Sequence, residues 1–171
     1  MNLKLSKNFS LAEACKSQTA QRHGISNLPE CTEDGHQVIV SLTALAQKVL
    51  QPIRDTHGRT DINSGLRVPA LNAIITGNPD SKSQHQFGEA CDIECPAISN
   101  IELARWIQQN LEVDQGILEM WVKGDKIDKP PHYGRSGWIH VSYKASGENR
   151  NKWMTASRQD GKVVYEDGIQ E

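Results

Sequence analysis

Two stretches far apart in the chain constrain its fold most, because each sets an ionisable side chain in or beside a strand-like run. In the stretch 83–93, His85 precedes Asp92 by seven residues. In the stretch 137–143, His140 lies within a run of alternating apolar and polar residues. Zinc prefers imidazole nitrogen and carboxylate oxygen, and a catalytic zinc keeps three protein ligands and one open position. We therefore expect the chain to fold so that His85, Asp92 and His140 meet around one zinc ion.

Length and charge limit the classes of protein to which the chain can belong. With 171 residues, 37% of them hydrophobic, we expect one globular domain over 1–171, with a core of about 5–152 and a C-terminal extension over 153–171. The net charge is −2 and the basic residues are scattered, so we expect no nucleic-acid partner. Apolar runs fall short of the roughly 18 residues of a membrane span, so we expect no membrane partner. We also expect a monomer.

The N-terminus and the cysteines point to a reducing compartment. The first residues lack the apolar core of a secretory signal, which predicts synthesis in a cytoplasm. The four cysteines are too few for a disulfide framework at this length, so we expect free thiols. An enzyme that uses the thiol of Cys91 or Cys95 is a third hypothesis beside those given below. Strand alternation weakens it, because both thiols fall on the face opposite Asp92.

Apolar spacing, caps and turn residues predict the elements. Helical spacing extends over about 34–55, where Pro52 is expected to end or kink the helix. The segment 123–137, rich in Gly, Asp and Pro, is predicted as a mobile loop at a site entrance, and about the last six residues are predicted to fray. The other expected elements are helices near 8–14, 68–75 and 100–110, strands near 60–64, 90–95, 116–122 and 138–143, and an edge strand within 153–165.

Alternation along the strands predicts which ionisable groups share a face of the sheet. Successive side chains of a strand point to opposite faces. In each of three predicted strands, one face is the more apolar and suits a core under the helices, while the other carries Asp92, Glu119 or His140. We therefore predict that these three side chains point into one cleft on the open face of the sheet.

Five motifs in a fixed order carry a resemblance to a known family. They are Ser64-Gly65-Leu66-Arg67 followed by Asn72, Ser83-Gln84-His85 with Gly88, Ala90 and Asp92, Asp114-Gln115 with Glu119, Trp138-Ile139-His140-Val141-Ser142, and the opening Leu5-Ser6-Lys7-Asn8-Phe9-Ser10. Over about residues 5–152 the chain closely resembles the phage-type branch of the zinc D-alanyl-D-alanine carboxypeptidase family. The resemblance implies an α+β fold, with helices packed on a small antiparallel sheet and a zinc site on the open face of that sheet.

The same resemblance implies roles for individual residues. It implies one zinc ion per chain on His85, Asp92 and His140, and an arginine, Arg67, that binds a carboxylate of the substrate. Ser83, two residues before a zinc ligand, is expected to bond the substrate or to support the ligands of the metal. The implied substrates are peptidoglycan stem peptides.

The chain departs from the family where the catalytic base is expected. Many relatives hold an acidic residue three positions before the last ligand or a histidine two before it, and here Gly137 and Trp138 occupy those positions. Glu119, on a neighbouring strand with the correct alternation, is then the expected general base. His132, in the loop before His140, is an alternative acid or oxyanion stabiliser.

The function expected from these features is metal-assisted hydrolysis of stem peptides by a zinc-dependent metallopeptidase. Cleavage of D-Ala-D-Ala by a carboxypeptidase and of L-Ala-D-Glu by an endopeptidase both stay open. Without an export signal, the expected protein is a phage or prophage cell-wall hydrolase that is made in the host cytoplasm and released through a membrane lesion, or one carried in the virion. The competing hypothesis is a catalytically inactive, zinc-stabilised module that binds cell wall or a protein partner.

Overall fold

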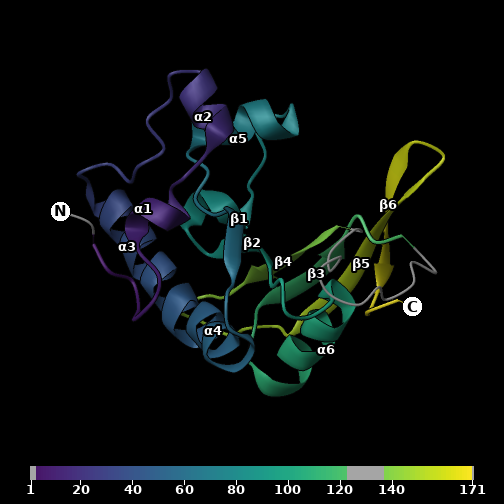
Figure 1. The fold of residues 1–171 in the computed structure, drawn as a ribbon. Helices are drawn as coiled ribbons and strands as arrows, with labels where there is room; N and C mark the ends of the chain where they lie inside the picture. Colours follow the sequence, from purple (N-terminus) through teal and green to yellow (C-terminus); the bar gives the residue numbers. More distant parts are fainter. Residues whose placement is uncertain (1–2, 123–136, 171) are drawn as a thin grey trace.

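A mixed six-stranded sheet with helices packed on one face forms the fold, so the predicted α+β class is confirmed (Figure 1). The computed structural model describes residues 3–122 and 137–170. The strands are β1 (Asp61–Ser64), β2 (Ala90–Glu94), β3 (Gln115–Glu119), β4 (Trp138–Ser142), β5 (Lys152–Gln159) and β6 (Lys162–Asp167). The helical elements are α1 (Leu11–Ala14), α2 (Gln18–Arg22), α3 (Glu33–Leu45), η1 (Ala46–Leu50), α4 (Gln51–His57), α5 (Pro69–Thr76), η2 (Gln84–Phe87) and α6 (Asn100–Asn110).

The order of strands across the sheet is β1-β2-β4-β3-β5-β6. Every neighbouring pair is antiparallel except β3 and β5, which run parallel. The β4 strand therefore lies between β2 and β3, although β3 precedes it in sequence. This order places β2, β4 and β3 side by side in the middle of the sheet, where a central site can be built.

Side-chain alternation divides the sheet into a covered face and an open face. The covered face belongs to a buried cluster that also includes apolar residues of α3, η1, α4 and α6; its strand members are Cys91, Ile93, Leu118, Ile139, Val141 and Trp153. Asp92, Glu119 and His140 occupy the alternate positions of β2, β3 and β4, so they share the open face. The predicted alternation of these strands is thus confirmed by their register.

The long amphipathic helix predicted over 34–55 is a continuous helical segment of α3, η1 and α4. Pro52 lies at the start of α4 and lacks the N–H that would bond the carbonyl one turn back. The preceding turn, η1, is widened, and the Gln51 N–H bonds the Ala46 oxygen five residues back. The widened turn lets the chain pass the proline without ending the helix.

Two helix starts follow their sequence signals. Ser10 caps α1 and Ser99 caps α6, and in both cases a glutamate three residues later returns a hydrogen bond to the cap. Among residues 3–122 and 137–170, no helix is both long and apolar enough to cross a membrane.

The C-terminal segment contributes two strands rather than one edge strand. The β5 strand pairs with β3 and β6 pairs with β5. The Gly168 N–H donates to the Trp153 oxygen at 2.8 Å, and the Gln170 N–H donates to Thr155 Oγ1 at 2.9 Å. The expected fraying is therefore wrong for the described residues up to Gln170, because this tail is held against β5.

The predicted loop over 123–137 lies outside the described residues except for Gly137.

Gly116 in β3 is required by close packing. A Cβ atom built at this position would lie 2.5 Å from the six-membered ring of Trp153, which is buried in the core. Any larger side chain must displace the indole from a packed cluster.

We predict that Gly116→Ala lowers the free energy of unfolding by about 1–3 kcal/mol through overpacking, as measured by urea denaturation. In the background of Trp153→Phe, the same change should cost less, because the smaller ring relieves the contact. Equal costs in the two backgrounds would mean that the indole does not set the penalty.

Candidate metal centre

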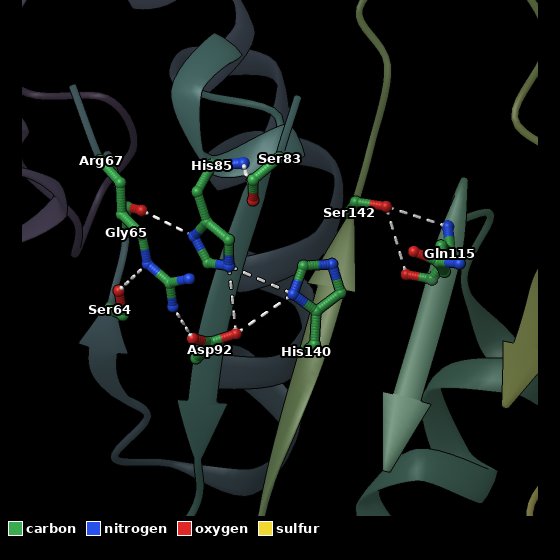
Figure 2. A network of polar contacts seen from close by, with 9 residues as sticks. All are labelled: Ser64, Gly65, Arg67, Ser83, His85, Asp92, Gln115, His140 and Ser142. Atoms are coloured by element: carbon green, nitrogen blue, oxygen red, sulfur yellow. Dashed lines mark hydrogen bonds and ion pairs between the residues drawn. The ribbon is translucent and has the colours of Figure 1, made fainter. Parts of the chain in front are cut away.

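Three elements bring the predicted metal ligands together. His85 lies on η2, Asp92 lies in the middle of β2, and His140 lies in the middle of β4. Asp92 and His140 are direct partners in the β2–β4 ladder, so their side chains stand next to each other on the open face. Figure 2 shows the imidazole of His85 reaching the same point from the η2 turn.

The three donor atoms form a compact triangle. His85 Nε2 lies 3.2 Å from His140 Nδ1 and 3.2 Å from Asp92 Oδ1, and His140 Nδ1 lies 3.1 Å from Asp92 Oδ1. Tetrahedral ligands at zinc bond lengths of roughly 2.0–2.2 Å are separated by about 3.3 Å. The residues present therefore fit a metal ion of this kind, and within the described part of the chain they form the one such group.

Hydrogen bonds behind the triangle orient its members. His85 Nδ1 donates to the Gly65 carbonyl oxygen at 2.7 Å, which leaves the lone pair of Nε2 facing the centre. The second oxygen of Asp92, Oδ2, accepts a hydrogen bond from Arg67 Nη2. Arg67 Nε in turn donates to Ser64 Oγ at 2.8 Å (Figure 2). Two of the three ligand side chains are thus held by protein groups away from the centre.

Burial and charge set the protonation of the centre. The exposed fractions of His85, Asp92 and His140 are 2%, 4% and 7%. Burial alone would raise the pKa of Asp92, but its polar contacts with the imidazoles of His140 and His85 hold it well below its usual range. Burial lowers the pKa of His85 against the opposing pull of Asp92. A carboxylate beside a neutral imidazole is the donor state that a metal cation requires.

Glu119 lies at the end of β3 on the face shared with His140. It pairs with Trp138 across the β3–β4 ladder and is half-buried. Burial raises its pKa, and the negative charge of Asp92 raises it further. A carboxyl group with a raised pKa, on the face of the sheet that carries the metal ligands, is suited to accept and return a proton.

The backbone around Glu119 explains why position 137 holds a glycine. Gly137 has φ +71°, and a Cβ atom there would lie 1.6 Å from the Glu119 carbonyl oxygen. Asn100 Nδ2 donates to the Gly137 oxygen at 2.9 Å and fixes this close approach. An acidic residue three positions before His140, one of the two arrangements that the family resemblance led us to expect, has no room on this backbone.

The other predicted site residues are placed as follows. The hydroxyl of Ser83 accepts a hydrogen bond from the His85 N–H at 3.4 Å, so it caps the η2 turn. The side chain of Arg67 is 15% exposed beside Asp92. His132 lies outside the described residues. The substrate-binding roles of Arg67 and Ser83 stay predictions.

A second buried carboxylate, Asp114, was not given a role by the sequence. Its exposed fraction is 0%, and it accepts hydrogen bonds from Gln84 Nε2 at 2.8 Å and from the Nε and Nη2 atoms of Arg150 at 2.9 and 2.5 Å. Lys144 Nζ lies 3.4 Å from Asp114 Oδ1. Asp114 and Gln84 both belong to motifs identified in the sequence. Their spacing along the chain does not show that they contact each other or Arg150.

A comparison with protein families identifies the family of this chain. The family model described as peptidase M15 matches residues 7–123, which is more than half of the chain and includes His85, Asp92 and Glu119. A search of curated proteins finds no match. The matched family is that of the zinc D-alanyl-D-alanine carboxypeptidases, so the resemblance carried by the motifs is confirmed at this level, while its phage-type branch stays a prediction. The chain belongs to the peptidase M15 family of metallopeptidases.

Proposed function

We propose that the chain is a zinc-dependent peptidase that hydrolyses peptide bonds of peptidoglycan stem peptides. The observation that carries the proposal is the triangle of His85, Asp92 and His140, whose donor atoms lie 3.1–3.2 Å apart in a chain of the M15 family. Two imidazoles and one carboxylate form a ligand set typical of catalytic zinc, which leaves one position open.

The bound zinc would polarise the scissile carbonyl and allow water to attack near neutral pH. Glu119 is the proposed general base, which takes a proton from the attacking water and returns it to the leaving amine. Its position on the open face and its raised pKa support this role. Gly137 and Trp138 cannot carry a proton, and Gly137 cannot be replaced by an acidic residue on this backbone.

Arg67 is the proposed anchor for a carboxylate of the stem peptide. Its Nε is used by Ser64 and one Nη2 hydrogen by Asp92, while the guanidinium carries further N–H groups that can fork onto a carboxylate. Because Arg67 touches the ligand Asp92, a carboxylate bound there would hold the adjacent peptide bond close to the metal centre. Ser83 is proposed to bond the substrate, or to support the metal ligands through the η2 turn that it caps.

The proposed location of action is the cell wall, with a phage or prophage hydrolase as the biological setting. Mass spectrometry of muropeptides after incubation with the zinc-loaded protein tests the proposed reaction, since the mass lost identifies the bond. Loss of a terminal alanine indicates a carboxypeptidase, and release of a longer peptide indicates an endopeptidase. Intact muropeptides would contradict the proposed activity and favour the inactive module. Gly137, which cannot carry a proton, supports that alternative.

We predict one zinc ion per chain, and we expect His85→Ala to lose it, because a buried donor is removed from a three-ligand set. Metal analysis of protein purified without chelator measures the zinc content. His23→Ala, which changes an exposed histidine, is the matched control and should retain the metal. Equal zinc in both variants would remove His85 from the site.

We predict that Glu119→Gln binds zinc and muropeptide normally but hydrolyses the peptide at least about a hundredfold more slowly, because the amide cannot accept a proton. The matched control is Glu94→Gln, which changes another open-face carboxylate, one hydrogen-bonded to Asn63. Its rate should stay near that of the parent. Parent-like turnover in Glu119→Gln would move the role of base to His132 or another group.

We predict that the thiols are dispensable for hydrolysis. Cys91 and Cys95 are free and buried on the covered face, and burial raises the pKa of both thiols. Replacing both by alanine should cost about 1–3 kcal/mol of unfolding free energy while muropeptide cleavage and zinc content persist. Loss of cleavage in a folded, zinc-loaded double variant would revive the thiol hypothesis.

A further inference from the structure

Asp114 is a fully buried carboxylate that the proposed chemistry does not use. It directly precedes β3 and is bound by side chains from three separate segments, namely Gln84 of η2, Lys144 after β4 and Arg150 before β5. An isolated carboxylate with no exposed surface is costly, so this set of partners has to be complete for the fold to tolerate it. Asp114 and its partners therefore hold three segments of the chain in fixed positions relative to one another.

One of these partners sits next to a metal ligand. Gln84 opens the η2 turn and directly precedes His85. This turn is a single stretch of 3₁₀-helix, which has weak hydrogen-bond geometry and little stability of its own. Within the turn, Ser83 caps the His85 N–H and the Glu89 N–H bonds the Gln84 oxygen at 3.1 Å. The 2.8 Å bond from Gln84 Nε2 to Asp114 Oδ2 connects the turn to the strands.

The other end of this connection is fixed to the strand of His140. The Asp114 N–H donates to the Ser142 oxygen at 2.8 Å. Figure 2 shows the bond of the next residue, Gln115, whose N–H donates to Ser142 Oγ at 3.0 Å. Ser142 is two residues beyond His140 on β4 and lies on the same face. Asp114 therefore spans the distance between the turn that carries His85 and the strand that carries His140.

We propose that Asp114 is a positioning residue of the metal centre, which acts through Gln84 to set where His85 Nε2 lies relative to Asp92 and His140. Neither Asp114 nor Gln84 belongs to the ligand triangle. The inference rests on the metal centre proposed above and is independent of the substrate. Outer groups that orient metal ligands typically contribute about 10–100-fold to metal affinity.

The first test removes the link. Gln84→Ala should bind zinc at least about tenfold more weakly in a chelator competition, and its cobalt-loaded form should show an altered visible absorption spectrum, because His85 is no longer held. Thr155→Val is the matched control for stability, since it breaks hydrogen bonds of a buried hydroxyl on the covered face of β5. The control should keep parent zinc affinity and spectrum at a similar loss of unfolding free energy.

The second test combines two changes to the link. Asp114→Asn alone should weaken zinc binding, because Asp114 Oδ2 accepts from both Gln84 Nε2 and Arg150 Nη2 and the amide that replaces the carboxylate cannot serve both. Combined with Gln84→Ala, it should weaken zinc binding by less than the product of the two single fold-changes, because both changes break the same link. The cobalt spectrum of the double variant should resemble that of Gln84→Ala.

Two results would overturn the proposal. One is parent-like zinc affinity and cobalt spectrum in Gln84→Ala. The other is a folded double variant whose loss of zinc affinity equals the product of the two single losses, as for residues that act separately. Because every readout is metal binding, a failure of peptide cleavage leaves this test unaffected, whereas a parent chain that binds no metal would overturn the metal centre itself.

Discussion

The antiparallel pairing of β2 with β4 is the constraint on which the rest of the structure depends. It makes Asp92 and His140 direct neighbours on the open face, while Cys91 with Val141 and Ile93 with Ile139 turn toward the core. Since side chains alternate, a slip of one residue would bury the two ligands under the helices and expose apolar residues. The hydrophobic effect thus enforces the register, and the register places the metal ligands.

The two buried carboxylates, Asp92 and Asp114, are both bound by an arginine but differ in what their remaining oxygens contact. Asp92 and Asp114 each accept a hydrogen bond from an arginine, and each carboxyl has its pKa lowered, that of Asp114 to about 2. Asp92 keeps its other oxygen directed at two imidazoles, whereas the oxygens of Asp114 are taken up by Gln84, Arg150 and Lys144. The first arrangement leaves a carboxylate able to bind a cation, and the second leaves one that can only hold other groups in position.

The sequence predicted the parts of the site that depend on short-range rules. The spacing of His85 and Asp92 and the alternation around His140 are local, and the structure brings these three side chains together. The strand order and the parallel pairing of β3 with β5 depend on long connections that local patterns do not encode. The same limit explains why the link from Gln84 through Asp114 to Arg150 was missed, since a buried carboxylate finds its partners only in the folded chain. Pro52 was expected to end or kink its helix, and the widened turn before it could not be foreseen from proline alone.

The contact between Gly137 and the carbonyl of Glu119 has a consequence for how this chain can change. A single substitution at position 137 cannot introduce the acidic group that relatives carry there, because the first atom of any side chain would overlap the backbone of β3. An acidic residue at 137 becomes tolerable only after β3 and the start of β4 have moved apart, which would also shift the strand that holds His140. An acidic side chain at position 137 would therefore require coordinated changes in two strands rather than a single substitution.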